Sequence, residues 1–277
     1  MIKYGSWQFY SNWHNCYSNF FNIYKKNLSI ALDQERYLKE STLAFDGNYP
    51  CGRTVSDVKG RRIVAGKNVV PHSQPWMVTI SEYKYNPRSN SKQGSYGCGG
   101  TLISRKHVLS VAHCAIRCKK DSDRCEDKPV HWATLGDHDK RKSDGELFVP
   151  VIKPFHVHPK AKQNDKPDGA FAYDYVIFLL ECCVTFNNYI QPICFPTEHH
   201  NKLIGKKVVV CGWGHTTYQG SSSPILQSIE IEIITDHKCA KAYSRGSIPY
   251  KKEYLFCAGD TMGIKTLAKM IVVVSSD

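Results

Sequence analysis

The stretch that most constrains the fold runs from Val108 to Cys114 and reads Val-Leu-Ser-Val-Ala-His-Cys. Its apolar start has the length of a buried strand, and it ends in a histidine followed by a cysteine. A second cysteine, Cys98, lies sixteen residues upstream, where the preceding strand would pair with this one. A bridge between Cys98 and Cys114 would lock the backbone on both sides of His113. General-base chemistry needs an imidazole held in one orientation, so we predict that role for His113, against the plainer interpretation of a core histidine beside a structural disulfide.

Composition describes a globular chain from an oxidising compartment. The 277 residues are 42% hydrophobic and 22% charged, which excludes a disordered protein and allows one large or two small domains. The twelve cysteines lack zinc-site spacing and predict disulfides, and we expect neither a metal nor another cofactor. The net charge of +12 comes from basic residues dispersed over several loops. We therefore expect no nucleic-acid partner, which would need one basic stripe with interleaved aromatics.

The N-terminal region conflicts with the cysteine content. Residues 1–24 contain no apolar run of the length that a signal peptide requires, and no stretch is long enough to span a membrane. Disulfides nevertheless favour an extracellular, secreted protein. We therefore expect that the true start of the protein is placed elsewhere. Residues 1–50 carry no motif and are treated as an N-terminal segment of unknown role.

The sequence motifs around Cys98 and His113 resemble the signature of the trypsin- and chymotrypsin-like serine proteases, peptidase family S1. Other short motifs of that family occur in the same order along this chain: Ile63-Val-Ala-Gly66, Gln74-Pro-Trp76, Tyr173-Asp174, Gln191-Pro-Ile-Cys194, Cys211-Gly-Trp-Gly214 and Phe256-Cys-Ala-Gly259. The resemblance extends from Cys51 to Gly259. It implies an all-β fold of two antiparallel β-barrels, with protein or peptide substrates and protease inhibitors as partners. It also matches the two histidines of His156-Val-His158 to a surface element.

Asp174 is the second residue with a predicted chemical role. It stands directly before the apolar strand Tyr175-Val-Ile-Phe-Leu-Leu180, where a buried carboxylate must find hydrogen-bond donors. The resemblance supplies the donor as the Nδ1–H of His113, which leaves Nε2 free to accept a proton. The plainer alternative is an aspartate that caps a turn at the start of the strand.

The dibasic sequence Arg61-Arg62 followed by Ile63 resembles the activation site of a zymogen, against the alternative of a charged loop. Cleavage after Arg62 by an activating protease would free the Ile63 ammonium to bury itself against a carboxylate. The boundaries that follow are a pro-segment over residues 51–62 and a protease domain over residues 63–277.

The resemblance implies two further disulfides, Cys51–Cys194 and Cys239–Cys257, and we expect Cys118 and Cys125 to close their own short loop. It provides no partner for Cys182 and Cys183, and Cys211 loses the partner that the family places beyond the nucleophile. In some family members the loop after Gly136 binds calcium. Its acidic residues here are Asp137, Asp144 and Glu146, but Lys140-Arg-Lys142 lies among them, so a cation site is the less favoured interpretation.

After Gly259 the chain departs from the family. Nowhere does it contain Gly-x-Ser-x-Gly, so the nucleophilic serine and the oxyanion amides are absent from the sequence as written. We expect the domain to be incomplete after about residue 259, with the second barrel lacking its closing strands and C-terminal helix.

We predict a frameshift between about Gly259 and Lys265. In the shifted frame each codon consists of the third base of one written codon and the first two bases of the next. Because Met270 is encoded only by ATG and every isoleucine codon begins with AT, the shifted codon across Met270 and Ile271 is GAT, which encodes aspartate. Residues 265–274 then permit Asp-Ser-Cys-Gln-Asp-Asp-Ser-Gly-Gly, one residue away from the family's nucleophile motif. The resemblance thus implies a trypsin-like endopeptidase that cleaves after Arg or Lys, with the chain as written inactive. The alternatives are a non-catalytic homologue that binds protein and a truncated product.

Overall fold

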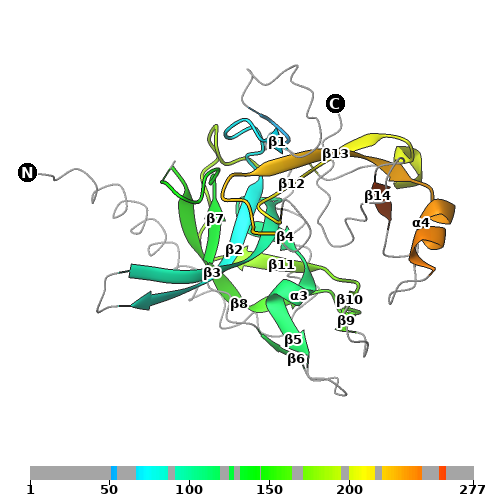
Figure 1. Ribbon diagram of the computed structural model, residues 1–277. Helices are drawn as coiled ribbons and strands as arrows, with labels where there is room; N and C mark the ends of the chain where they lie inside the picture. The colour runs from blue at the N-terminus through cyan, green and yellow to red at the C-terminus, as the bar shows by residue number, and fades with distance from the viewer. Residues whose placement is uncertain are drawn as a thin grey trace, which may run out of the picture.

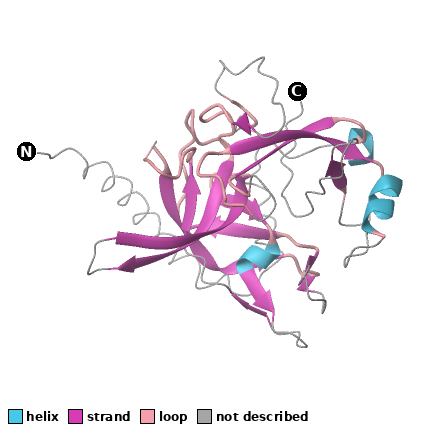
Figure 2. Cartoon of the chain, viewed as in Figure 1, coloured by secondary structure: helices cyan, strands magenta, loops and turns pink. Residues whose placement is uncertain are grey.

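The computed structural model describes residues 51–54, 67–86, 91–118, 125–127, 132–143, 145–163, 171–194, 200–215, 220–244 and 256–259. Figure 1 shows two β units joined along one side, with few helices. Figure 2 shows the predominance of strands. The expected all-β fold is confirmed.

The first unit is a closed six-stranded antiparallel barrel in the order β11-β4-β3-β2-β7-β8. Its strands are β2 (Met77–Asn86), β3 (Ser91–Leu102), β4 (His107–Ser110), β7 (Trp132–Leu135), β8 (Leu147–Val157) and β11 (Val176–Leu180). Closure removes exposed strand edges and places alternate side chains inside.

The barrel interior is filled by aliphatic and aromatic side chains. Along β11, Val176, Phe178 and Leu180 are buried while the residues between them are half-buried, as the alternation of a strand requires. Phe178 packs edge-on against Phe155 with ring centroids 5.0 Å apart, a favoured aromatic geometry. This apolar filling holds the ends of β4 and β11, where the predicted site residues lie.

The second unit is a four-stranded sheet. It contains β1 (Lys67–Asn68), β12 (Lys207–Gly212), β13 (Gln227–Ile234) and β14 (Cys257–Gly259). β12 pairs with one edge of β13, and β1 and β14 share the other edge. Within the described ranges this sheet does not close into a barrel. Residues 260–277, which we predicted to lack the closing strands, lie outside those ranges.

Short elements complete the described chain: α3 (Ala112–Ala115), β5 (Ile116–Cys118), β6 (Cys125–Asp127), β9 (Lys162–Gln163), β10 (Phe171–Ala172), the 3₁₀ turn η2 (His200–Leu203) and α4 (Asp236–Tyr243). Thr235 caps α4 by accepting a hydrogen bond from the backbone of Lys238. None of the helices in the described ranges is long and apolar enough to cross a membrane.

The loop after β7 joins the two units. The Trp213 indole donates to the backbone oxygen of His138 at 3.2 Å, and the Lys140 amide donates to Pro224 at 2.9 Å. The Lys140 ammonium lies 4.6 Å from the centre of the Trp213 ring, a cation–π contact. Burial lowers the pKa of Lys140 to about 8, although the nearby Asp137 acts in the opposite direction.

Gly100 in β3 is required for the close approach of β4. A Cβ added there would lie 2.7 Å from the Val108 side chain and 3.3 Å from the backbone oxygen of Leu109. We expect Gly100→Ala to lower the free energy of unfolding by about 1–3 kcal/mol, because overpacking displaces the strand. Urea denaturation measures the change. Gly99→Ala is the matched control, since its Cβ would meet nothing within 4 Å, and an equal loss in both variants would contradict the prediction.

Candidate active site

His113 and Asp174 come from neighbouring strands of the first barrel. β4 leads through Val111 into α3, which carries His113, and Asp174 lies just before β11. The two strands are antiparallel partners, with Val176 opposite Ser110, so the end of one lies beside the start of the other. Residues sixty-one positions apart in the chain therefore meet at one rim of the barrel.

The Asp174 carboxylate contacts His113 twice, once at the imidazole and once at the backbone. His113 Nδ1 lies 2.7 Å from Asp174 Oδ2, and the backbone N–H of His113 donates to Oδ1 at 2.9 Å. An ionised carboxylate only accepts hydrogen bonds, so Nδ1 carries a proton, and in the neutral imidazole Nε2 is then the acceptor. The side chains are 34% and 23% exposed, which leaves the imidazole open to a reactant while the carboxylate is largely covered. The arrangement presents a basic nitrogen of fixed orientation at the surface.

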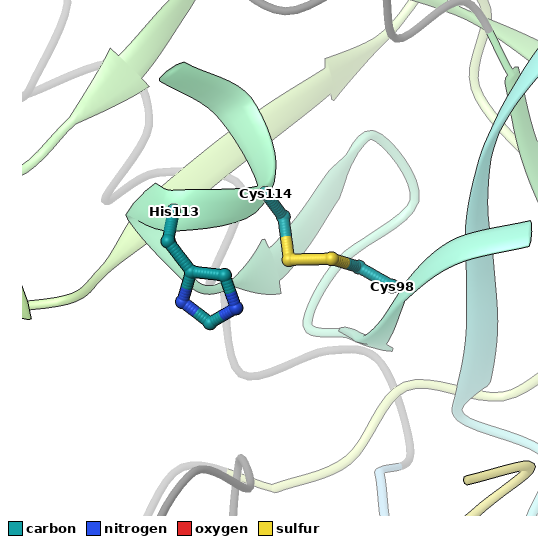
Figure 3. A group of neighbouring side chains, drawn as sticks. All are labelled: Cys98, His113 and Cys114. Carbon is teal, nitrogen blue, oxygen red and sulfur yellow. A yellow bond between two sulfur atoms is a disulfide. The ribbon is translucent and has the colours of Figure 1, made fainter. Parts of the chain in front are cut away.

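A disulfide stands behind the histidine. Cys98 and Cys114 are bonded, and Figure 3 shows the imidazole of His113 beside this bridge. Potential ligand atoms of these three residues lie within 4.8 Å of one another, a grouping that could suggest a metal site. Metal ligation by cysteine uses a thiolate, and here the two sulfurs are bonded to each other. The cluster is therefore a structural support for the histidine.

The other cysteines divide into bonded and free groups. The predicted bridges Cys51–Cys194 and Cys239–Cys257 are both present. Cys125 is disulfide-bonded, and its backbone lies opposite that of Cys118 in the β5–β6 register; the Cys118–Cys125 bridge stays a prediction.

The sequence provided no partner for Cys182, yet this residue is disulfide-bonded. Nothing in the local sequence signals that bond. Cys183 is exposed with a free thiol. Cys211 is also free, and burial raises the pKa of its thiol to about 12.

In the acidic loop, basic side chains occupy the positions near the carboxylates. Arg141 donates twice to Asp139, at 2.8 and 2.7 Å, and this hydrogen bonding lowers the pKa of Asp139 to about 2. Asp137 and Glu146 line a cavity of about 210 Å³ that Lys140, Arg141 and Lys142 also line. Asp144 lies outside the described residues, as do Arg62 and Ile63 of the predicted activation site.

Comparison with protein families matches residues 63–267 to Trypsin. The chain belongs to the trypsin family of serine proteases. It is 32% identical to the venom protease of Bombus pensylvanicus over 208 residues, covering 73% of this chain and 76% of that protein. The match to the venom serine protease Bi-VSP of Bombus ignitus is 31% identical over 220 residues, 78% of this chain and 56% of the relative.

Solved structures agree with the family assignment. The Drosophila Grass clip serine protease of the Toll pathway superposes with a TM-score of 0.56 at 25% identity, over 80% of this trypsin-family chain and 59% of that one. Neuropsin, a serine protease expressed in the limbic system of mouse brain, superposes with a TM-score of 0.52 at 25% identity, over 72% and 75% of the two chains.

One residue beside the site has a contact that the sequence did not predict. His158, which was matched to a surface element, contacts both neighbours of Asp174 through its backbone and its ring. No pattern around it in the sequence distinguishes it from His156, because the contact depends on how two distant segments meet.

Proposed function

We propose that this chain carries the general-base part of a serine endopeptidase site that cleaves peptide bonds after Arg or Lys. The double contact between His113 and Asp174 is the observation that carries the proposal. In this chemistry a serine Oγ attacks the scissile carbonyl while His113 Nε2 accepts the serine proton. Asp174 stabilises the imidazolium, and the proton passes from His113 to the leaving amine when the bond breaks. No cofactor takes part.

The nucleophile is the component that the written sequence lacks. The sequence of residues 1–277 lacks Gly-x-Ser-x-Gly, the motif that supplies the nucleophilic serine and the oxyanion amides, each amide worth roughly 10²–10³ in rate. We therefore propose that the chain as written has no endopeptidase activity. We further propose that residues from about 260 onward result from a frameshift, because the shifted frame of residues 265–274 permits the nucleophile motif. The aspartate six positions before its serine supports cleavage after basic residues.

We also propose how the enzyme is secreted and activated. It is an extracellular zymogen, cleaved after Arg62 by another protease, with Ile63 as the new N-terminus and protein substrates and inhibitors as partners. The Cys51–Cys194 bridge supports it, because this bridge would keep residues 51–62 attached to the protease domain of residues 63–277 after cleavage. The relatives named for venom support an extracellular location, as do the disulfides.

The test is the nucleotide sequence of gene and transcript across codons 255–277 and the bases that follow. We expect an open frame, shifted by one nucleotide, that encodes Asp-Ser-Gly-Gly and further strand-forming residues. A genomic and transcript sequence that supports only the written frame would overturn the frameshift. The protein would then be a non-catalytic homologue that acts by binding.

A further inference from the structure

Asp174 lies in a tight turn with an unfavourable backbone. The Tyr175 amide donates to the Tyr173 carbonyl at 2.7 Å, which makes Asp174 the centre of a three-residue turn. Tyr173 has φ of 50°, in the left-handed region that bulky residues rarely adopt. A conformation of this kind persists only where the surrounding structure holds it.

His158 contacts both residues that flank the aspartate. Its backbone N–H donates to the Tyr175 oxygen at 2.9 Å. Its imidazole stacks on the Tyr173 ring, with centroids 4.9 Å apart and planes only 4° from parallel. The same imidazole meets the Tyr175 ring edge-on at 6.3 Å. The turn that carries Asp174 is therefore held on both sides by one residue.

The His158 ring is itself held in place. The Lys160 amide donates to His158 Nδ1 at 3.1 Å, and the Ala161 amide donates to the His158 carbonyl at 2.8 Å. The Lys160 ammonium also lies 5.6 Å from the centre of the Tyr173 ring. The stack thus joins two turns: the one that follows β8 and the one that precedes β11.

We propose that His158 is a positioning residue for Asp174, acting through the stacked Tyr173 ring and the Tyr175 backbone. This inference rests on the proposed function, in which Asp174 orients His113. Both carboxylate oxygens bind the same residue, so a rotation of the Asp174 turn lengthens at least one of those two hydrogen bonds. Relaxation of Tyr173 out of its left-handed conformation would produce such a rotation.

The experiment observes the His113 Nδ1–H proton by NMR in the full chain labelled with ¹⁵N-histidine. Its resonance position and its exchange rate with water report the hydrogen bond to Asp174 directly, independently of proteolysis. We expect His158→Ala to accelerate exchange by about tenfold, as the strained turn relaxes. His158→Phe keeps a flat ring on Tyr173 and should stay within about twofold of the unsubstituted chain. His156→Ala, a histidine two residues earlier that is exposed, is the matched control and should also leave the exchange rate unchanged.

Two further variants make every outcome decisive. Tyr173→Leu removes the stack from the other side and should reproduce the His158→Ala result, so it decides the case if His158→Ala does not fold. Asp174→Asn tests the pair itself and should abolish the hydrogen-bonded resonance. A resonance that survives Asp174→Asn would overturn the proposed function. One that is lost in Asp174→Asn but unchanged in folded His158→Ala or Tyr173→Leu would overturn only the positioning role.

Discussion

For the protein encoded by the proposed shifted frame, Asp174→Asn is expected to lower kcat for an Arg-ester substrate about 10⁴-fold. The asparagine amide can donate to His113 Nδ1, which favours the tautomer with the proton on Nε2. That nitrogen can then no longer accept the serine proton, although the side-chain geometry is nearly unchanged. Steady-state kinetics with Arg- and Lys-ester substrates measure the loss, and the written chain of residues 1–277 should show no turnover.

The matched control for this prediction is Asp236→Asn. Asp236 is an aspartate in the first turn of α4, on the second unit, and its substitution should leave kcat unchanged within about twofold. A loss of less than tenfold in Asp174→Asn would contradict the assigned role, as would turnover by the written chain.

Removing the Cys98–Cys114 bridge by replacing both cysteines with alanine is expected to cost about 3 kcal/mol of folding free energy. The bridge closes a loop of sixteen residues, and its loss returns conformational entropy to the unfolded chain. Because Cys114 follows His113 directly, the histidine should also lose orientation. Urea denaturation measures the stability, and the His113 Nδ1–H resonance measures the local effect.

The Cys239–Cys257 bridge provides the comparison, because its sequence separation of eighteen is nearly the same. Its removal should cost a similar free energy by the same argument, again about 3 kcal/mol, but should leave the His113 resonance unchanged. If both double variants broadened that resonance equally, the bridge beside His113 would have no special role in holding the imidazole.

Local sequence determined the residue types and strands of the site. The apolar runs before His113 and after Asp174 predicted β4 and β11, and the position of Cys98 in the preceding strand predicted its bridge to Cys114. These features are readable because strand periodicity and cysteine chemistry are expressed within a few residues. The order of the family's sequence motifs along the chain then predicted the all-β fold and membership of the trypsin family, and the comparisons confirm both.

Only the tertiary structure decided which distant groups meet. The 2.7 Å contact of His113 with Asp174 depends on barrel closure, which makes β4 and β11 antiparallel neighbours. The stack of His158 on Tyr173 likewise joins segments that carry no mutual signal along the chain. A single sequence encodes the local period and the side-chain chemistry of each segment. The geometry between segments follows from how the whole core packs, so it emerges only when the barrel is closed.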